Sequence, residues 1–537
     1  MGILADMKMY SRFAWGLRSF LRHTLTLEEA KAIVQKRMAE REENFLRLVR
    51  KGIFGYLKSP YLPLMKLADC EMGDIENMVR SQGLEGTLSA LREAGVYVTF
   101  EEFKGRKPLI RNGRVINVKD HDFDNPYLSR FYYAETGGTT GAGTRIPIDL
   151  DHLAAQSPNV MLALETHGVL KVPTAIWYGI LPSPTGINYN LRQARFGQLI
   201  EKWFSPLMAE DLKPSMKNRL ATFYIVRMGR LFGVPIPAPE PIPLNQSSLI
   251  AHWASEALKR HGACVIRTHV SMALRVSMAA QEDGLDLRGL TFIGSGEPPT
   301  PTKVKGITLS GARYIPIYVL AETGHLGMGC LWPVDENDNH FYKDLFALIQ
   351  YPRKVEGFGL SVNAFYFTSL VPTAPKLMLN VENDDYGLIE TRSCGCPLEG
   401  YGFTEHLRHI RSFKKLTGEG VTLIGSEMIH ILEEVLPARF GGSLLDYQLL
   451  EEEDEKGFTR LNLLVSPEVE IADEKELIKV VLESLGRASD SADFARALWS
   501  QAKTIQVKRK KPVCTDQGKL MPLHLQHKIK QTEDSMH

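Results

Sequence analysis

The sequence has no long hydrophobic run, no export signal and few cysteines. No stretch approaches the roughly 18 consecutive apolar residues of a membrane-spanning helix, so no integral membrane segment is expected. The N-terminus lacks the short apolar run and small-residue cleavage site of a signal peptide, which makes the cytoplasm the expected location. Six cysteines among 537 residues are too few and too scattered for a disulfide framework, so free thiols or metal ligands are expected.

An excess of charge of one sign is also missing. The chain has 64 Lys and Arg residues against 63 Asp and Glu residues, so no global field attracts a polyanion and nucleic acid is not an expected partner. Internal repeats and low-complexity tracts are absent, and the 44% hydrophobic and 24% charged fractions are typical of a globular protein. The length exceeds the roughly 250 to 300 residues at which a single core stops growing, so two or more domains are expected. The sequence does not indicate the oligomeric state.

The pattern of apolar residues changes along the chain. Around 13–21 and 30–38 apolar positions recur at helical spacing, which predicts two amphipathic helices. The first has a basic polar face; we expect it to pack on the protein, with a membrane surface as the alternative. From about 130 to 390, short β-rich runs alternate with helical stretches such as 271–283, which predicts an α/β architecture. The predicted strands are 175–180, 264–268, 290–293 and 314–319.

A smaller α+β unit is predicted beyond residue 399. Its predicted elements are a helix at 425–436, a strand at 460–466, and helices at 473–485 and 493–504. The whole chain is therefore predicted to be an α/β protein with a helical N-terminal region (1–120) forming part of a large domain, the core of that domain (121–409), and a small C-terminal α+β domain (410–537). The Lys- and His-rich tail, 503–530, is either a solvated end or a loop that contacts phosphate.

One loop combines glycines and threonines at high density, directly after the strand-like run 131–133. Its residues are Thr136, Gly137, Gly138, Thr139, Thr140, Gly141, Ala142, Gly143 and Thr144. Glycine lets the backbone turn its N–H groups toward an anion, and threonine hydroxyls add donors without adding charge. The loop predicts a nucleotide phosphate site, with a surface turn as the alternative.

The common P-loop motif does not fit this segment. That motif needs a lysine followed by serine or threonine after the second glycine. Gly138 and Gly143 have the required spacing, but Thr144 stands where the lysine belongs. The segment is therefore not a P-loop.

The loop resembles the Ser/Thr-Ser-Gly-Thr-Thr-Gly signature of the acyl-adenylate-forming (AMP-binding) superfamily, which includes acyl-CoA ligases and peptide synthetase adenylation domains. Thr144, in place of the more usual lysine, resembles the phenylacetate-CoA ligase branch. The resemblance implies a large N-terminal α/β domain with β-sheets packed by helices, a small mobile C-terminal domain that acts as a lid, and ATP and Mg²⁺ as ligands.

Two further segments match the superfamily in the expected order. Ser295, Gly296, Glu297 and Pro298 resemble the turn that lines the adenine. Residues 318–322 resemble the Tyr-Gly-x-Ser/Thr-Glu segment, which implies that Tyr318 stacks on the adenine and that Glu322 holds Mg²⁺. Val319 and Ala321 depart from that pattern.

The C-terminal half carries two more matches. Arg411 resembles the arginine at the hinge between the two domains, which implies a contact with the ribose. Residues 515–519 resemble the Thr-x-x-Gly-Lys segment, which implies that Lys519 is the catalytic lysine. The position of the acid that holds the ribose hydroxyls is occupied by Ser393, and Glu390 is the nearest substitute.

A group of soft ligands lies between Glu322 and the hinge. Three thiolates and an imidazole, from Cys330, His340, Cys394 and Cys396, have the donor set of a tetrahedral Zn²⁺ site, although buried free cysteines are the alternative. Some members of the phenylacetate-CoA ligase branch carry Cys and His at similar places and bind a structural zinc there. The resemblance therefore implies a structural Zn²⁺.

The activity implied is attack of a carboxylic acid on ATP to form an acyl-adenylate with release of pyrophosphate, followed by acyl transfer to coenzyme A. A carrier or protein thiol, or an amine, is the alternative acceptor. A third possibility is a catalytically impaired nucleotide-binding descendant, because Val319, Ala321 and Ser393 depart from the pattern. His269, just after the predicted strand 264–268, is the candidate substrate-pocket residue, with a packing role as the alternative.

Overall fold

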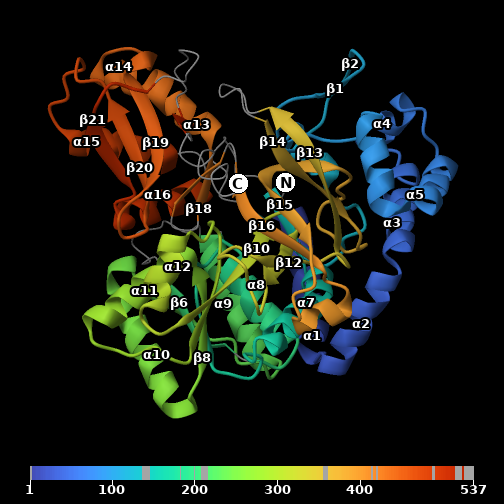
Figure 1. The fold of residues 1–537 in the computed structure, drawn as a ribbon, viewed down its shortest axis with the longest axis horizontal. Helices are drawn as coiled ribbons and strands as arrows, with labels where there is room; N and C mark the ends of the chain where they lie inside the picture. Colours follow the sequence, from blue (N-terminus) through green and yellow to red (C-terminus); the bar gives the residue numbers. More distant parts are fainter. Residues whose placement is uncertain are drawn as a thin grey trace.

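A computed structural model describes residues 3–135, 145–181, 183–198, 200–206, 216–354, 361–412, 415–418, 421–486, 490–513 and 523–524. A 12-stranded sheet runs through the larger part of the molecule, and a separate 4-stranded sheet lies in the C-terminal part (Figure 1). The strands of the large sheet are β5 (Thr174–Trp177), β6 (Ile200–Ser205), β7 (Pro239–Pro241), β8 (Cys264–His269), β9 (Leu290–Ser295), β10 (Arg313–Leu320), β11 (Gly324–Gly329), β12 (Asn339–Phe341), β13 (Phe346–Lys354), β14 (Ser361–Ser369), β15 (Val381–Thr391) and β16 (Glu405–Ser412).

The large sheet has a parallel half and an antiparallel half. Its strand order is β13-β14-β15-β16-β12-β11-β10-β9-β8-β5-β6-β7. The strands from β7 to β10 pair in parallel, whereas those from β10 to β13 pair antiparallel. Strand β10 belongs to both halves, so it joins the two kinds of pairing.

Helices cover both faces of the parallel half, which explains its nearly continuous hydrophobic strands. In β8, Cys264 and Ile266 pack in one core with helices α10, α11 and α12, whereas Val265 points to the opposite face and the core beside α7. A buried carboxylate, Asp149, caps α7 by accepting from two of its first N–H groups. The helices of this half are α7 (Leu150–Thr166), α8 (Thr185–Ala194), α9 (Met216–Leu231), α10 (Ser247–His261), α11 (Val270–Glu282) and α12 (Pro301–Thr308).

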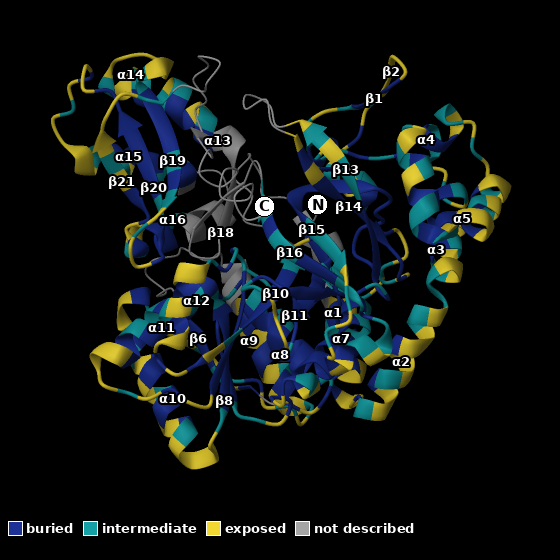
Figure 2. Ribbon diagram, viewed as in Figure 1, coloured by how far each residue is buried: buried dark blue, intermediate teal, exposed yellow. Residues whose placement is uncertain are grey.

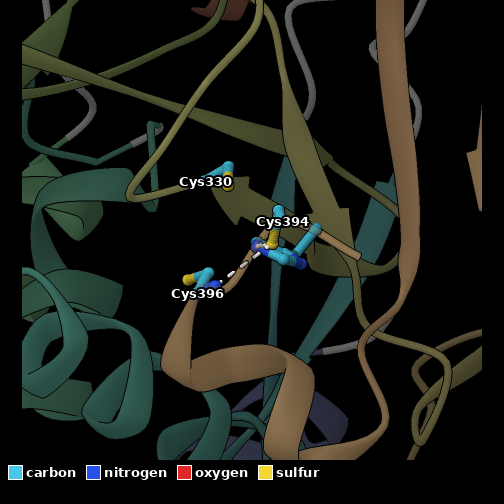
Figure 3. A group of neighbouring side chains, drawn as sticks. Cys330, Cys394 and Cys396 are labelled. Carbon is cyan, nitrogen blue, oxygen red and sulfur yellow. Dashed lines mark hydrogen bonds between the residues drawn. The ribbon is translucent and has the colours of Figure 1, made fainter. Parts of the chain in front are cut away.

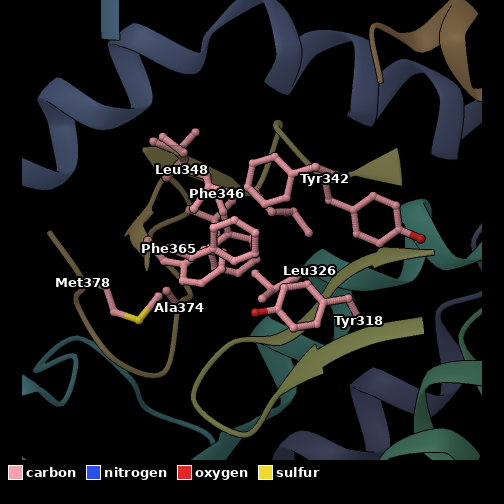
Figure 4. Packing of buried hydrophobic residues seen from close by; sticks show 14 of the residues in the cluster. Tyr318, Leu326, Tyr342, Phe346, Leu348, Phe365, Ala374 and Met378 are labelled. Atoms are coloured by element: carbon pink, nitrogen blue, oxygen red, sulfur yellow. The ribbon is translucent and has the colours of Figure 1, made fainter. Parts of the chain in front are cut away.

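The N-terminal helices from α2 to α6 pack beside the antiparallel half, with α2 along α7 and α5 against β13. Their apolar faces join one buried cluster with β10 to β16, part of which Figure 4 shows around Tyr318, Leu326, Phe346 and Phe365. Helix α1 instead joins a separate buried cluster with β5 and β6 of the parallel half. The N-terminal helices are α1 (Ile3–Arg22), α2 (Leu27–Ala39), α3 (Arg41–Val49), α4 (Leu62–Leu67), α5 (Met72–Glu93) and α6 (Phe100–Phe103).

The C-terminal sheet has the order β21-β20-β19-β22 and packs with its own helices over a buried interior (Figure 2). It touches the large sheet's helices through Phe458, whose ring lies 4.4 Å from the Arg275 guanidinium carbon. Its elements are α13 (Gly425–His430), α14 (Leu436–Phe440), β19 (Tyr447–Glu453), β20 (Thr459–Val465), α15 (Glu474–Gly486), α16 (Asp490–Ala502), β21 (Ile505–Arg509) and β22 (Leu523–His524). Three hairpins complete the fold: β1 (Leu109–Arg111) with β2 (Arg114–Ile116), β3 (Phe131–Glu135) with β4 (Arg145–Asp149), and β17 (Lys415–Gly418) with β18 (Val421–Ile424).

The predicted fold class is confirmed, since a mixed α/β sheet precedes a small α+β unit. The predicted strands correspond to β5, β8, β9, β10 and β20, and the predicted helices to α1, α2, α11, α13 to α14, α15 and α16. The predicted boundary at residue 410 falls inside β16, which ends at Ser412. None of the helices in the described ranges is both long enough and apolar enough to cross a membrane.

Candidate functional site

The carboxyl ends of β5, β8, β9 and β10 lie at one edge of the sheet because these strands are parallel. In open α/β sheets ligands bind at this edge. Tyr178, His269, Ser295 and Glu322 lie at or directly after these strand ends. The structure therefore brings four segments together that are far apart in the sequence.

The turn after β9 begins at Ser295, and Gly296 adopts a φ of +87°, which favours glycine. The Ser295 hydroxyl lies 3.2 Å from the Tyr178 hydroxyl, and Nδ1 of His269 lies 3.2 Å from the Ser295 carbonyl oxygen. The His269 ring meets Tyr178 edge-on at 4.8 Å. Burial lowers the pKa of His269, so the imidazole is neutral near pH 7. His269, the predicted pocket residue, thus lies at the predicted adenine turn.

Glu297 is committed to a buried ion pair. Its carboxylate accepts from the Ser271 N–H at 2.8 Å, the Ser271 hydroxyl at 2.7 Å and the Lys303 ammonium at 2.9 Å. Burial alone would raise the pKa of Glu297, but the Lys303 charge and the Ser271 hydrogen bonds lower it below its ordinary value. Lys303 also donates to the Thr459 hydroxyl at 3.1 Å, so the pair links the turn after β9 to β20.

Tyr318 donates its hydroxyl to Asp385 at 2.8 Å, across from β10 to β15. Asp385 also accepts from the Ser412 hydroxyl in β16. Burial and the Asp385 charge raise the pKa of Tyr318 well above its ordinary value, so the phenol keeps its proton. Sequence reasoning missed Asp385, although the acidic pair at 384–385, just before Tyr386 in a buried strand, was a signal.

Arg411 lies beside this group, opposite Tyr386 in the pairing of β15 with β16. It donates to the Ile410 carbonyl at 3.0 Å. Burial lowers the pKa of Arg411. Nearby acidic groups, among them Glu453 of β19, raise this pKa and so partly offset the effect of burial. Strand β19 of the small sheet therefore lies close enough to influence the charge of Arg411.

Ser393 and Glu390, at and near the expected position of the ribose acid, have other partners. Ser393 donates to Glu399, next to the cysteine turn. Glu390 accepts from Arg408 at 2.7 Å and is partly exposed. Asp385, rather than either of these two residues, is in contact with Tyr318.

Glu322, in the turn between β10 and β11, pairs with Lys104, and both side chains are 6% exposed. Lys104 directly follows α6, in the N-terminal region where the sequence showed no motif. The two residues are 218 positions apart, and no local pattern predicts such a contact. Only the folded chain therefore shows that Lys104 is the partner of the candidate residue Glu322.

The four predicted zinc ligands also come together. Cys330 follows β11, His340 lies in β12, and Cys394 and Cys396 lie in the turn after β15. One donor atom from each lies within 4.8 Å of the others. Figure 3 shows Cys330 facing the turn that carries Cys394 and Cys396. Two of the three thiols are buried, and Cys394 is half-buried.

The imidazole of His340 is oriented for ligation. Its Nδ1 lies 2.7 Å from the Phe403 carbonyl oxygen, so Nδ1 carries the proton and Nε2 faces the thiols, 3.8 Å from the Cys394 sulfur. A hydrogen bond from the Cys330 thiol lowers the pKa of Cys396.

A second possible grouping, Cys330 with Asp338 and His406, shares one thiol with the first. Asp338, however, already accepts from His406 at 2.6 Å and from Arg392. Its carboxylate is therefore satisfied without a metal, and the set of three thiols and one imidazole is the more complete ligand group.

The predicted phosphate loop, Thr136 to Thr144, and the predicted catalytic Lys519 lie outside the described residues. The strands on either side of the loop, β3 and β4, pair antiparallel and bring Glu135 opposite Arg145.

No family model matches the chain, and comparison with curated proteins also finds no match. Among solved structures, the fold is that of adenylate-forming ligases. 2-Hydroxyisobutyryl-CoA ligase, in complex with 2-HIB-AMP and CoA, matches with a TM-score of 0.54 at 15% identity, covering 96% of this chain and 94% of that chain. The amide bond synthetase Mcba from Marinactinospora thermotolerans matches with a TM-score of 0.39 at 13% identity, covering 74% of this chain and 69% of that chain.

The Glu297–Lys303 pair predicts a stability effect. Glu297→Gln leaves the Lys303 ammonium without its counter-charge, and we expect a loss of about 3–5 kcal/mol in the free energy of unfolding. Chemical denaturation measures this loss. Because folding lowers the pKa of Glu297 below its ordinary 4.5, the pair's contribution is complete above pH 4.5 and is lost as the pH falls through the folded-state value.

Glu28→Gln is the matched control, because Glu28 forms an ion pair with Lys31 at the surface. We expect little change in the free energy of unfolding for this variant, since solvent screens such a pair. If both variants lost the same free energy of unfolding, burial would not be the reason that the Glu297–Lys303 pair stabilises the protein.

Proposed function

We propose that this chain activates a carboxylic acid as its acyl-adenylate, using ATP and releasing pyrophosphate, and then transfers the acyl group to coenzyme A. The observation that carries the proposal is that Tyr318, Asp385 and Arg411 come together at the end of β10, the strand that pairs with β9 and therefore lies next to its Ser295 turn. This convergence occurs in a chain with the fold of adenylate-forming ligases. We place the chain in the phenylacetate-CoA ligase branch and in the cytoplasm as part of the same proposal.

The nucleotide would lie along the carboxyl edge of the sheet. Residues 295–298 and Tyr318 would line the adenine, and Asp385 and Arg411 would bind the ribose. Asp385 would supply the carboxylate for the ribose hydroxyls, because Ser393, at the expected position, has none. The loop from Thr136 to Thr144 supplies N–H and hydroxyl donors to the phosphates, since such donors stabilise anions without adding charge.

Glu322 fits the Mg²⁺ role that the resemblance implies. Mg²⁺ is usually held by one or two carboxylates together with substrate phosphates. Glu322 is a buried carboxylate at the correct edge of the sheet, with Lys104 as its counter-charge. Bound there, Mg²⁺ would neutralise charge on the pyrophosphate as it leaves.

The protein's part in the reaction is positioning. The substrate carboxylate attacks the α-phosphorus in line with the departing pyrophosphate, and no covalent intermediate with the enzyme is needed. Lys519 would place an ammonium beside the reacting carboxylate and the α-phosphate, where negative charge is concentrated. His269 and Tyr178 would border the acid, because both lie at the ends of strands next to Ser295.

The acyl acceptor has two alternatives to coenzyme A, a carrier or protein thiol and an amine. Incubation with ATP, Mg²⁺ and each acceptor, followed by mass spectrometry of the product, distinguishes the three. A catalytically impaired descendant would instead bind nucleotide without releasing pyrophosphate with any acid.

The first test is exchange of pyrophosphate into ATP with a broad panel of acids. We expect exchange in the wild type, and a decrease of roughly 100-fold in Lys519→Ala, because one charged donor to the transition state is lost. Lys511→Ala is the control, since Lys511 is exposed and pairs with Glu468. Absence of exchange with every acid, and no effect of Lys519→Ala, would falsify the enzymatic proposal.

The ribose role of Asp385 has a separate test. Asp385→Asn removes a charged acceptor, and we expect KM for ATP to rise at least about 10-fold. Glu390→Gln, which removes the partner of Arg408, should leave this KM within about 2-fold. Both values come from steady-state kinetics. If KM for ATP rose in Glu390→Gln but not in Asp385→Asn, Glu390 rather than Asp385 would bind the ribose.

We also propose a structural Zn²⁺ at Cys330, His340, Cys394 and Cys396. Three thiols and one imidazole form a standard structural donor set, and the free Nε2 of His340 suits ligation. The site joins β11 and β12 to the turn after β15. Its expected role is to fix that turn, and it lies outside the nucleotide chemistry.

Metal analysis tests this site. We expect one zinc per chain by mass spectrometry of the metal, lost in the double variant Cys394→Ser with Cys396→Ser, together with a lower Tm. Cys70→Ser is the control, because Cys70 lies outside the group and is also a free thiol. Zinc retained in the double variant, or lost in the control, would contradict the assignment.

A further inference from the structure

Two arginines are buried beneath the nucleotide edge. Arg267 lies in β8 on the same face as His269, since alternate residues of a strand share a face. Its side chain is 0% exposed, and none of its three guanidinium nitrogens forms a hydrogen bond of normal geometry among the described residues; its polar neighbour is the Tyr189 phenol. Arg192, in α8, is 3% exposed, and its Nε likewise lacks a partner there.

The partners that Arg192 does have are neutral. Its two terminal nitrogens lie 2.9 Å from Nε2 of His325 and 3.0 Å from Oε1 of Gln156. Burial, together with Arg192 and Arg267, lowers the pKa of His325 well below its ordinary value, so this imidazole is uncharged. Because Nε2 of His325 accepts from Arg192, its Nδ1 carries the proton, and that donor also lacks a partner among the described residues.

Neither arginine forms an ion pair with a carboxylate in the part of the chain that the structure describes. The groups with the largest electrostatic effect on them are phenols, Tyr189, Tyr178 and Tyr342, and the two guanidiniums repel each other. Burial lowers the pKa of Arg192 to about 10, which still leaves it charged at neutral pH. Two buried charges without an anion are strongly unfavourable.

The two arginines and His325 surround one aromatic ring. The guanidinium carbons of Arg267 and Arg192 lie 5.0 Å and 5.8 Å from the centroid of Tyr189, and the His325 ring lies 5.8 Å from it. The unpaired atoms of these three side chains are all donors. An anion, which accepts hydrogen bonds and carries negative charge, has the complementary chemistry.

This arginine cluster (Arg192, Arg267 and His325) connects directly to the proposed acid site. Tyr189 stacks on Tyr178 at 5.1 Å, and the Tyr178 hydroxyl donates to the Thr268 carbonyl at 2.9 Å beside His269.

On its other side, the partner of Arg192, Gln156, donates to the Thr323 carbonyl at 2.6 Å, next to Glu322. The cluster therefore lies between the two segments that would border the acid and the metal.

We propose that Arg192 and Arg267 bind a second carboxylate on the acid that the enzyme activates, so that its substrates are dicarboxylic acids. This inference rests on the proposed adenylation. One carboxylate reacts at the nucleotide edge, and the other completes the arginine cluster. The alternative is that the two arginines permanently bind an inorganic anion. The experiment below distinguishes this anion from a substrate carboxylate.

The test compares matched acids in pyrophosphate exchange by the full chain. Dicarboxylates of four to eight carbons are paired with monocarboxylates of the same length. We expect kcat/KM for the best dicarboxylate to exceed that of its monocarboxylate by roughly 100-fold, and Arg267→Met to bring this ratio close to one. Arg192→Met should act in the same direction. Arg195→Met is the control, since Arg195 donates to the Phe20 and His23 carbonyls instead.

A binding arm is independent of turnover. The Tm of the wild type and of Arg267→Met is measured with the same dicarboxylates, with the matched monocarboxylates, and with chloride or phosphate. We expect only the dicarboxylates to raise the Tm of the wild type, and no rise in Arg267→Met. Because Arg267→Met removes a buried unpaired charge, it should fold, which its own Tm reports.

The outcomes separate the two proposals. Equal exchange with monocarboxylates, unaltered by Arg267→Met, overturns the dicarboxylate inference and leaves adenylation standing. Stabilisation by chloride or phosphate alone also overturns it and assigns the arginines to a resident anion. Absence of exchange with every acid overturns the proposed function. In that case the Tm measurements test the arginine site independently. A rise in Tm with dicarboxylates supports the site, and no rise overturns it.

Discussion

The position of β10 is the constraint on which the rest of the site depends. This strand pairs in parallel with β9 and antiparallel with β11, so it joins the two halves of the large sheet. The parallel pairing puts the turn at Ser295 and the turn at Glu322 at the same edge. The antiparallel half then brings β15 and β16 around to Tyr318, which explains why Asp385 and Arg411 arrive beside it. A shift in the register of β10 would move Tyr318 and Glu322 relative to Ser295, Asp385 and Arg411.

Among the buried charged residues that the structure describes near this edge of the sheet, two carboxylates form ion pairs, whereas two arginines do not. Glu297 is paired with Lys303 and Glu322 with Lys104, as the cost of removing charges from water requires. Arg192 and Arg267 have no such partner among the described residues, although they are as deeply buried. Structural stability alone does not account for two unpaired guanidiniums, because apolar side chains would fill the same volume at lower cost. A ligand that brings the missing negative charge does account for them.

The cysteine group and the small sheet act on the same segment of chain from opposite ends. Cys394 and Cys396 follow β15, and Arg411 lies near the end of β16, which pairs with β15. The cysteine turn therefore lies at one end of this strand pair, while β19, with Glu453, lies near the other. The small sheet also contacts the turn after β9, through the hydrogen bond between Thr459 and Lys303. A displacement of the small sheet would therefore change the surroundings of both Glu297 and Arg411.

The sequence by itself determined the α/β class, most of the strands and the group of three cysteines and one histidine that lie together in the structure. Strands such as β8 and β9 are short apolar runs, and soft ligands such as Cys394 and Cys396 are recognisable from residue type and spacing, both of which are local properties. It also indicated Tyr318 and Arg411, because each lies in a short motif. Only the tertiary structure decided that Lys104 pairs with Glu322, that Asp385 rather than Ser393 or Glu390 meets Tyr318, and that Arg192 and Arg267 share one buried place. These choices depend on which strands and helices become neighbours in space. Long-range packing sets that arrangement, and it leaves no periodicity in the sequence around any one of these residues.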